Sequence, residues 1–175
     1  MQMLSKVMRL DLQYSCEQSH HYQRQTCYLA PFADEAAEHL AKRLLSYLAL
    51  FELQPELSRH DHAGKKPDLY LQDQHQHFLL WCQVDIPNEK QLQRASHQSE
   101  QVLLVSTDED LPKLRQLSKG LANVQFLPLS PPQLALCCQM FKGHMQWSVW
   151  RDECQLLITD GQQQLEINLA ESVCR

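Results

Sequence analysis

The sequence predicts an α/β fold with a mixed central sheet that helices flank and with β-hairpins towards both ends of the chain. Three observations support this prediction. From Asp34 to Ser106 the apolar pattern gives the order helix, strand, strand, strand, helix, strand. Residues 6–14 alternate polar and apolar side chains, and an Asp160–Gly161 pair separates two short alternating runs, as in a hairpin.

The N-terminal part predicts a hairpin followed by a helix. In Lys6–Tyr14 one parity is apolar, which indicates a strand with one buried face, and His21–Leu29 is a weaker strand that can pair with it. Asp34–Phe51 is the clearest helix, with acidic residues in its first turn, where the helix dipole favours them. Its apolar residues recur at helical spacing: Ala37, Leu40, Ala41, Leu44, Leu45, Leu48 and Phe51.

The middle of the chain predicts the central sheet. Gln54–Arg59 is a short strand, and the charged stretch His60–Lys66 is a loop. A strand follows Pro67, and the nearly continuous apolar run Phe78–Val84 predicts a central strand buried on both faces. The remaining elements expected here are a helix that Asn88 caps and that runs to about Gln98, and a buried strand over Gln101–Ser106.

The last third predicts two more helices and a meander. Thr107 and Asp110 have the spacing of a capping box, which predicts a helix to about Gly120. Ser130 precedes a proline at the first position of a second helix. The strands expected here are Val124–Leu127, Met145–Arg151, Cys154–Thr159 and Gln164–Leu169.

Composition limits the classes of protein. A chain of 175 residues suits one domain, here 1–175, and no apolar run approaches the roughly 18 residues of a membrane span. A net charge of −5 excludes a generally basic nucleic-acid protein but leaves room for a local basic patch. The seven cysteines include no C-x-x-C pair, and the N-terminus lacks an apolar signal region, so we expect reduced thiols and a cytoplasmic protein.

One group of residues predicts a metal site. Asp68 begins one strand, and Gln83 and Asp85 end the next, so a hairpin would bring their oxygens together around a hard cation such as magnesium. Glu38, at the margin of the first helix's apolar stripe, could add a third carboxylate. Lys90 and Arg94 are four residues apart on the following helix, where a cation could stabilise a phosphoryl transition state.

The histidines of the same region suggest a weaker alternative. His60 and His62 alternate, as do His75 and His77, which is compatible with ligands on one side of a β-ribbon. All four lie in or beside predicted loops, so we interpret them as solvated loop residues. The sequence contains no P-loop, dinucleotide-binding or G-x-S-x-G motif.

The segments Lys66–Leu69 and Leu80–Lys90 resemble the YaeQ family of bacterial proteins, whose pattern is Pro-Asp followed by roughly Trp-Ile-Glu-Val-Gly-x-Pro-Asp-Glu-Lys. The first helix and the closing hairpin at Asp160–Leu169 also resemble that family, so the resemblance covers nearly the whole chain. It implies a single YaeQ-like domain with the core of the PD-(D/E)xK nuclease-like superfamily, and it implies no established activity.

The sequence departs from the superfamily pattern at the expected metal site. The superfamily has a carboxylate at position 83 and a lysine two residues later, whereas this chain has Gln83 and Asp85. Lys90 is a possible substitute for the lysine, and Arg94 matches a basic position of the family helix. A neutral amide holds magnesium less well than a carboxylate, so we expect a degenerate site that binds magnesium weakly.

These observations leave three functional hypotheses. The first is a binding or regulatory protein whose leading ligand is nucleic acid, contacted by Lys65, Lys66 and Arg94. The second is an active magnesium-dependent nuclease or phosphodiesterase, in which Asp68 and Asp85 hold the metal, Glu38 assists and Lys90 stabilises the departing charge. The third is a protein-interaction module without a nucleic-acid role, which the acidic balance suits.

Overall fold

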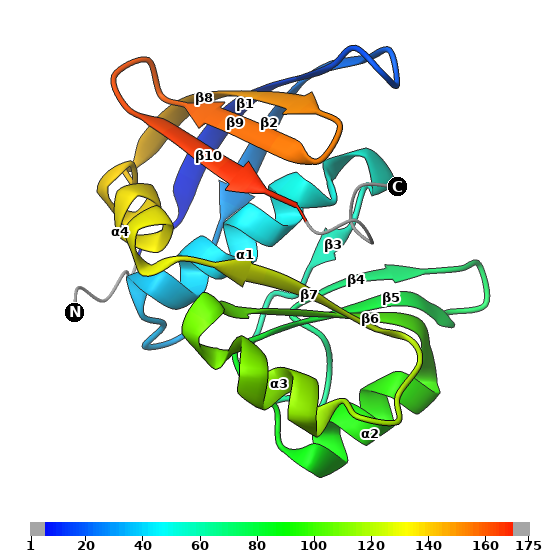
Figure 1. Ribbon diagram of the computed structural model, residues 1–175. Helices are drawn as coiled ribbons and strands as arrows, with labels where there is room; N and C mark the ends of the chain where they lie inside the picture. Colours follow the sequence, from blue (N-terminus) through cyan, green and yellow to red (C-terminus); the bar gives the residue numbers. More distant parts are fainter. Residues whose placement is uncertain (1–5, 170–175) are drawn as a thin grey trace. The chain divides into compact units, whose positions relative to one another are not determined.

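The computed structural model describes residues 6–169 and divides the chain into two compact units. The first unit is formed by the chain up to Ala41 and from Pro132 onwards, and the second by Lys42–Pro131. Figure 1 shows a β-sheet in each of them. No helix within residues 6–169 has the length and apolar character that crossing a membrane requires.

The first unit contains a five-stranded sheet in the order β10-β9-β8-β1-β2. The predicted hairpin is present, because β1 (Met8–Cys16) pairs antiparallel with β2 (His21–Leu29). The predicted meander is also present, in the strands β8 (His144–Asp152), β9 (Gln155–Thr159) and β10 (Gln164–Asn168). A parallel pairing of β1 with β8 joins the two predicted pieces into one sheet, which local sequence signals did not predict.

One face of this sheet is apolar on β1 and on the meander, because alternate residues of a strand point to the same side, whereas β2 places His21, Gln23 and Gln25 opposite the buried residues of β1. On β1 the buried residues are Met8, Leu10, Leu12, Tyr14 and Cys16. The helix α4 (Pro131–Gln139) lies beside β10, where Gln133 Nε2 donates to the Glu166 backbone oxygen at 2.8 Å. The expectation that the thiols are reduced is wrong for Cys154, which is disulfide-bonded.

The second unit contains a mixed sheet in the order β3-β4-β5-β6-β7. Its strands are β3 (Glu56–Leu57), β4 (Leu69–Gln72), β5 (Phe78–Val84), β6 (Ser99–Thr107) and β7 (Val124–Leu129). The apolar strand β5 is the middle strand, as predicted, antiparallel to β4 and parallel to β6. The prediction that the strands at Asp68 and Asp85 are adjacent and antiparallel is therefore confirmed.

Helices cover both faces of this sheet, and side-chain parity on β5 shows which helix covers which face. Trp81 packs with Leu92 of α2 (Glu89–Gln98) and Leu114 of α3 (Leu111–Leu117), and Figure 1 shows these two helices on the same side. The neighbouring residue Cys82 points the other way and bonds to Ser46 of α1 (Ala37–Ala49). The buried C-terminal part of α1 thus packs on the opposite face.

Of the two predicted helix caps in this unit, one is absent and one is present. Thr107 does not cap a helix: its hydroxyl donates to the Asp110 carboxylate at 3.1 Å, and a 3-10 turn, η2 (Asp108–Asp110), precedes α3. A second 3-10 turn, η1 (Phe51–Leu53), follows α1. The Asn88 cap is confirmed, since its side chain accepts from the Gln91 backbone while the Gln91 side chain accepts from the Asn88 backbone.

Candidate functional site

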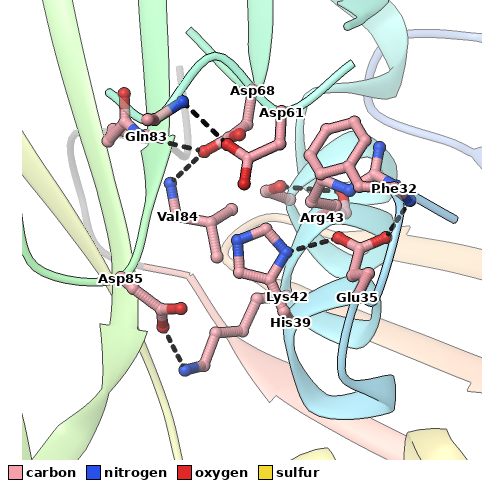
Figure 2. Close-up of polar contacts among 12 residues, drawn as sticks. Phe32, Glu35, His39, Lys42, Arg43, Asp61, Asp68, Gln83, Val84 and Asp85 are labelled. Carbon is pink, nitrogen blue, oxygen red and sulfur yellow. Dashed lines mark hydrogen bonds and ion pairs between the residues drawn. The ribbon is translucent and has the colours of Figure 1, made fainter. Parts of the chain in front are cut away.

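Asp68 lies at the start of β4 and is buried, with 5% of its surface exposed. Leu69 pairs with Cys82, and the Asp68 backbone nitrogen donates to the Cys82 backbone oxygen at 2.9 Å, which brings Asp68 beside Gln83. Asp68 Oδ2 accepts from the Val84 backbone nitrogen at 2.8 Å and from Gln83 Nε2 at 3.1 Å (Figure 2). The structure therefore brings together the first two residues of the predicted metal set.

The Gln83 side chain is oriented by a neighbour on its own strand. Its Oε1 atom accepts from the Trp81 indole nitrogen at 3.2 Å. An indole nitrogen can only donate, so the Gln83 oxygen must face Trp81 and the amide N–H must face Asp68. A metal shared with Asp68 would need the oxygen on that side, so this pair of residues does not fit a magnesium ion.

Asp85 leaves the strand and turns towards α1. Its φ angle is +68°, a left-handed conformation that ends the regular alternation of β5. Its carboxylate forms an ion pair with Lys42 Nζ (Figure 2). Gln83 lies with Trp81 on the sheet face that α2 covers, so residues 83 and 85 serve opposite faces of the sheet.

Lys42 is a site residue that the sequence analysis missed. Its side chain is 8% exposed, whereas that of Asp85 is 48% exposed, so the ammonium is buried at a partly solvated carboxylate. The signal was present in the sequence, because Lys42 and Arg43 interrupt the apolar run that Leu40, Ala41, Leu44 and Leu45 form. A buried ammonium requires a compensating partner, and the carboxylate at a strand end supplies it.

The charge of Asp68 also acts on a thiol of the same sheet. Burial raises the pKa of Cys82 strongly, the Asp68 carboxylate raises it further, and a hydrogen bond with Ser46 lowers it. Cys82 is fully buried and free. The thiol is therefore held neutral, as a packing group of the core and not a nucleophile.

The remaining predicted carboxylate, Glu38, lies in the first turn of α1 and belongs to the first unit. Its charge is one cause of the raised pKa of Cys138, after burial. The more buried acid of this segment is Glu35, which accepts from the Phe32 backbone nitrogen at 3.0 Å and pairs with His39 Nδ1 (Figure 2). The spacing of Glu35 and His39, four residues apart, was visible in the sequence, but their burial was not.

The predicted cationic residues Lys65, Lys66, Lys90 and Arg94 are all exposed. Loop 60–66 lies against the first turn of α2, where Gln91 Nε2 donates to the Ala63 backbone oxygen at 2.8 Å. Gly64 permits this approach, because it has φ +80° and an added Cβ would lie 2.6 Å from the Gln91 amide. The two loop lysines and Lys90 thus lie on contacting segments.

A pocket of about 800 Å³ lies beside this loop in the second unit. We call it the basic-aromatic pocket, because its lining includes these basic and aromatic side chains: Arg59, His60, His62, Lys66, Tyr70 and Phe78. Tyr70 donates its hydroxyl to Glu56 at 2.9 Å, and this bond is the largest cause of the raised pKa of Tyr70. The pocket was not predicted, since it needs the loop folded against β3 and β4.

The alternating histidines form ring pairs. The ring centres of His60 and His62 are 6.5 Å apart, and those of His75 and His77 are 6.3 Å apart. Within residues 6–169 no three or more His, Cys, Asp and Glu side chains are grouped so that they could hold a metal ion. The first pair instead contributes to the basic-aromatic pocket.

Comparison with known proteins agrees with this fold. The family model described as YaeQ protein matches residues 1–169. The "Uncharacterized protein YaeQ" of Escherichia coli (strain K12) is 24% identical over 146 residues, which is 81% of each chain, and that of Shigella flexneri gives the same values.

Two crystal structures of YaeQ proteins have the same fold. The protein from Xanthomonas axonopodis pv. citri superimposes with a TM-score of 0.83 at 19% identity, covering 94% of this chain and 96% of that chain. The protein from Pseudomonas syringae gives 0.83 at 21% identity, covering 94% and 93%. On the strength of the family match and this shared fold, the chain belongs to the YaeQ family.

Proposed function

We propose that this chain is a nucleic-acid-binding protein built on a nuclease-type core whose metal site no longer supports catalysis. One observation carries this proposal: the Gln83 amide donates to Asp68 at the position where a nuclease of the PD-(D/E)xK type has a metal-binding carboxylate. The Gln83 N–H group takes the place of a metal ion, because it forms a hydrogen bond with the Asp68 carboxylate directly.

The core supports the comparison with that superfamily. The elements α1, β3, β4, β5, α2 and β6 follow one another in the order that the family resemblance implies, and β5 is the middle strand. The rival, an active nuclease, needs Asp68 and Asp85 on one ion with Glu38 assisting. Against it, Asp85 pairs with Lys42 on the other face of the sheet.

Nucleic acid is favoured as the ligand by the exposed cations near this site. Lys65 and Lys66 lie in a loop that contacts α2, which carries Lys90 and Arg94. Phosphate groups supply most of the affinity in sequence-independent binding, so a local group of cations is sufficient even on a chain with a net charge of −5.

Fluorescence anisotropy with labelled single- and double-stranded oligonucleotides at low salt tests the proposal. We expect binding at tens of micromolar or tighter that weakens as salt rises, with the salt slope falling by about one to two after Lys65→Glu and Lys66→Glu together. Lys119→Glu, an exposed position after α3, is the matched control. Absence of binding would favour a protein-interaction module, whereas magnesium-dependent cleavage that Asp68→Ala abolishes would establish the nuclease.

A further inference from the structure

The basic-aromatic pocket combines the groups that recognise a nucleotide. Its volume of about 800 Å³ falls in the range of small-molecule sites, roughly 300–1,000 Å³. It lies at the beginning of β4, where Lys66 and Pro67 line it immediately before Asp68. Lys66 is thus both one of the exposed loop lysines and part of the pocket wall.

The aromatic part of the pocket is held in place by its neighbours. The rings of Tyr70 and Phe78 meet edge to face with centres 5.9 Å apart. Phe78 packs in turn on the buried Trp81 at 5.1 Å, and Glu56 holds the Tyr70 hydroxyl. Ring faces fixed in this way can stack on a base with little loss of side-chain freedom.

The charged part of the pocket is complementary to phosphate. Arg59 and Lys66 contribute cationic side chains to the lining, and His60 and His62 contribute ring nitrogens. Arg59 and Tyr70 line the same pocket, and the charge of Arg59 lowers the pKa of Tyr70, against the larger effect of Glu56. Among the described lining residues Glu56 is the one acid, and it already accepts from Tyr70.

The arrangement favours an unpaired nucleotide over a base pair. In a duplex both faces of each base are covered by stacked neighbours, so a ring such as Tyr70 cannot reach a base face unless the base is flipped out. The lining amides of Gln72 and Gln76 offer the donors and acceptors that the exposed edge of an unpaired base needs.

We propose that the basic-aromatic pocket binds one unpaired nucleotide of a single-stranded nucleic acid, with the base against Tyr70 and Phe78 and the phosphate held by Arg59 and Lys66. This inference rests on the proposed function and adds the ligand class and the contacting residues.

Anisotropy with a labelled single-stranded 12-mer and a blunt duplex of the same sequence tests it, with adenosine monophosphate as a second probe followed by saturation-transfer NMR. Tyr70→Leu removes the ring and should weaken single-strand binding about tenfold, while duplex binding stays unchanged. Tyr70→Phe keeps the ring and should bind like the unmodified protein. Arg59→Gln should lower the salt slope by about one, with Lys119→Gln as its control. A thermal melt of each variant verifies folding.

The possible failures are distinguishable. If the protein binds nucleic acid through Lys65 and Lys66 but Tyr70→Leu leaves single-strand affinity unchanged, the pocket assignment is overturned and the proposed function stands. If adenosine monophosphate binds in a manner that depends on Tyr70 while no oligonucleotide binds, the proposed function and the single-strand ligand are both overturned. Absence of binding to every probe overturns the pocket together with the proposed function.

Discussion

Replacing Gln83 by glutamate changes the central contact of the site from attraction to repulsion. The amide nitrogen lies 3.1 Å from Asp68 Oδ2, so Gln83→Glu brings two carboxylates to within contact distance. Two like charges about 4 Å apart repel by about 4 kcal/mol at an effective dielectric constant near 20. Because residue 83 is only partly buried, its new carboxylate can rotate towards water, and we expect a loss of about 2–3 kcal/mol in the free energy of unfolding.

The loss should depend on pH and on metal. Two carboxylates that share a site raise the pKa of the pair, so the destabilisation should be full near pH 7 and should shrink as the pH falls below about 5. Added manganese or magnesium should restore the stability of the variant but not raise that of the unmodified protein. A metal at 100 times its Kd would return about 2.7 kcal/mol.

Thermal melts and urea unfolding, with and without 10 mM metal (a concentration of about 100 times a Kd of 0.1 mM), measure both effects. For a chain of this length 2–3 kcal/mol corresponds to a lower melting temperature by about 4–12 °C. Gln93→Glu, which adds the same charge at an exposed position of α2, is the control and should change little. If Gln83→Glu is as stable as this control at pH 7 without metal, residues 68 and 83 do not meet as described and the reasoning fails.

Three further predictions concern the ion pair, a thiol and the partly exposed carboxylate of Asp11. Asp85→Asn keeps the left-handed backbone but removes the charge that pairs with buried Lys42, so urea unfolding should show a loss of about 1–2 kcal/mol in the free energy of unfolding. Lys42→Met should cost less, because half-exposed Asp85 can be hydrated. Equal losses in the two variants would contradict this asymmetry. Cys82 should resist iodoacetamide in the folded protein, since burial and Asp68 raise its pKa, and mass spectrometry that finds it alkylated under native conditions would refute this. Hydrogen bonds from His144 and Thr26 and the charge of Arg9 lower the pKa of Asp11 from 3.8 to about 2. The stabilising effect of the Asp11 carboxylate is therefore present above pH 3.8 and is lost as the pH falls towards 2. An NMR titration of this carboxyl group with a midpoint near 3.8 would be inconsistent with these contacts.

Local patterns predicted the elements of the fold better than their assembly. Periodicity of 2 identified β1 and β2, and the continuous apolar run identified β5 as the middle strand, because each signal is a property of one segment. The parallel pairing of β1 with β8 depends on residues more than 130 positions apart, for which a single sequence contains no local signal. The Thr107–Asp110 spacing misled for a different reason: the two side chains bond to each other instead of to the backbone.

The sequence could predict which residues of the candidate site meet, but not which way the Gln83 amide points. The hairpin register follows from two adjacent strands, so the meeting of Asp68 with Gln83 could be predicted. The direction of the Gln83 amide could not, because it depends on the rotamer of Trp81. The turn at Asp85 could not be predicted either. Asp85 has a φ of +68°, and an Asp at a strand end followed by Ile86 and Pro87 gives no sequence signal for that angle.

The Trp81–Gln83–Asp68–Val84 chain of hydrogen bonds explains why glutamine suits position 83. The indole of Trp81 can only donate, and the Asp68 carboxylate can only accept, so the residue between them must accept on one side and donate on the other. Glutamine does both, whereas glutamate could accept from Trp81 but would repel Asp68 unless a cation lay between them. Burial of the Asp68 carboxylate is compensated here because the Val84 N–H and the Gln83 amide both donate to the same oxygen. A strand pair of this geometry can thus be stable either with a carboxylate and a metal or with an amide and no metal, and Gln83 with Asp68 is a residue pair of the second kind.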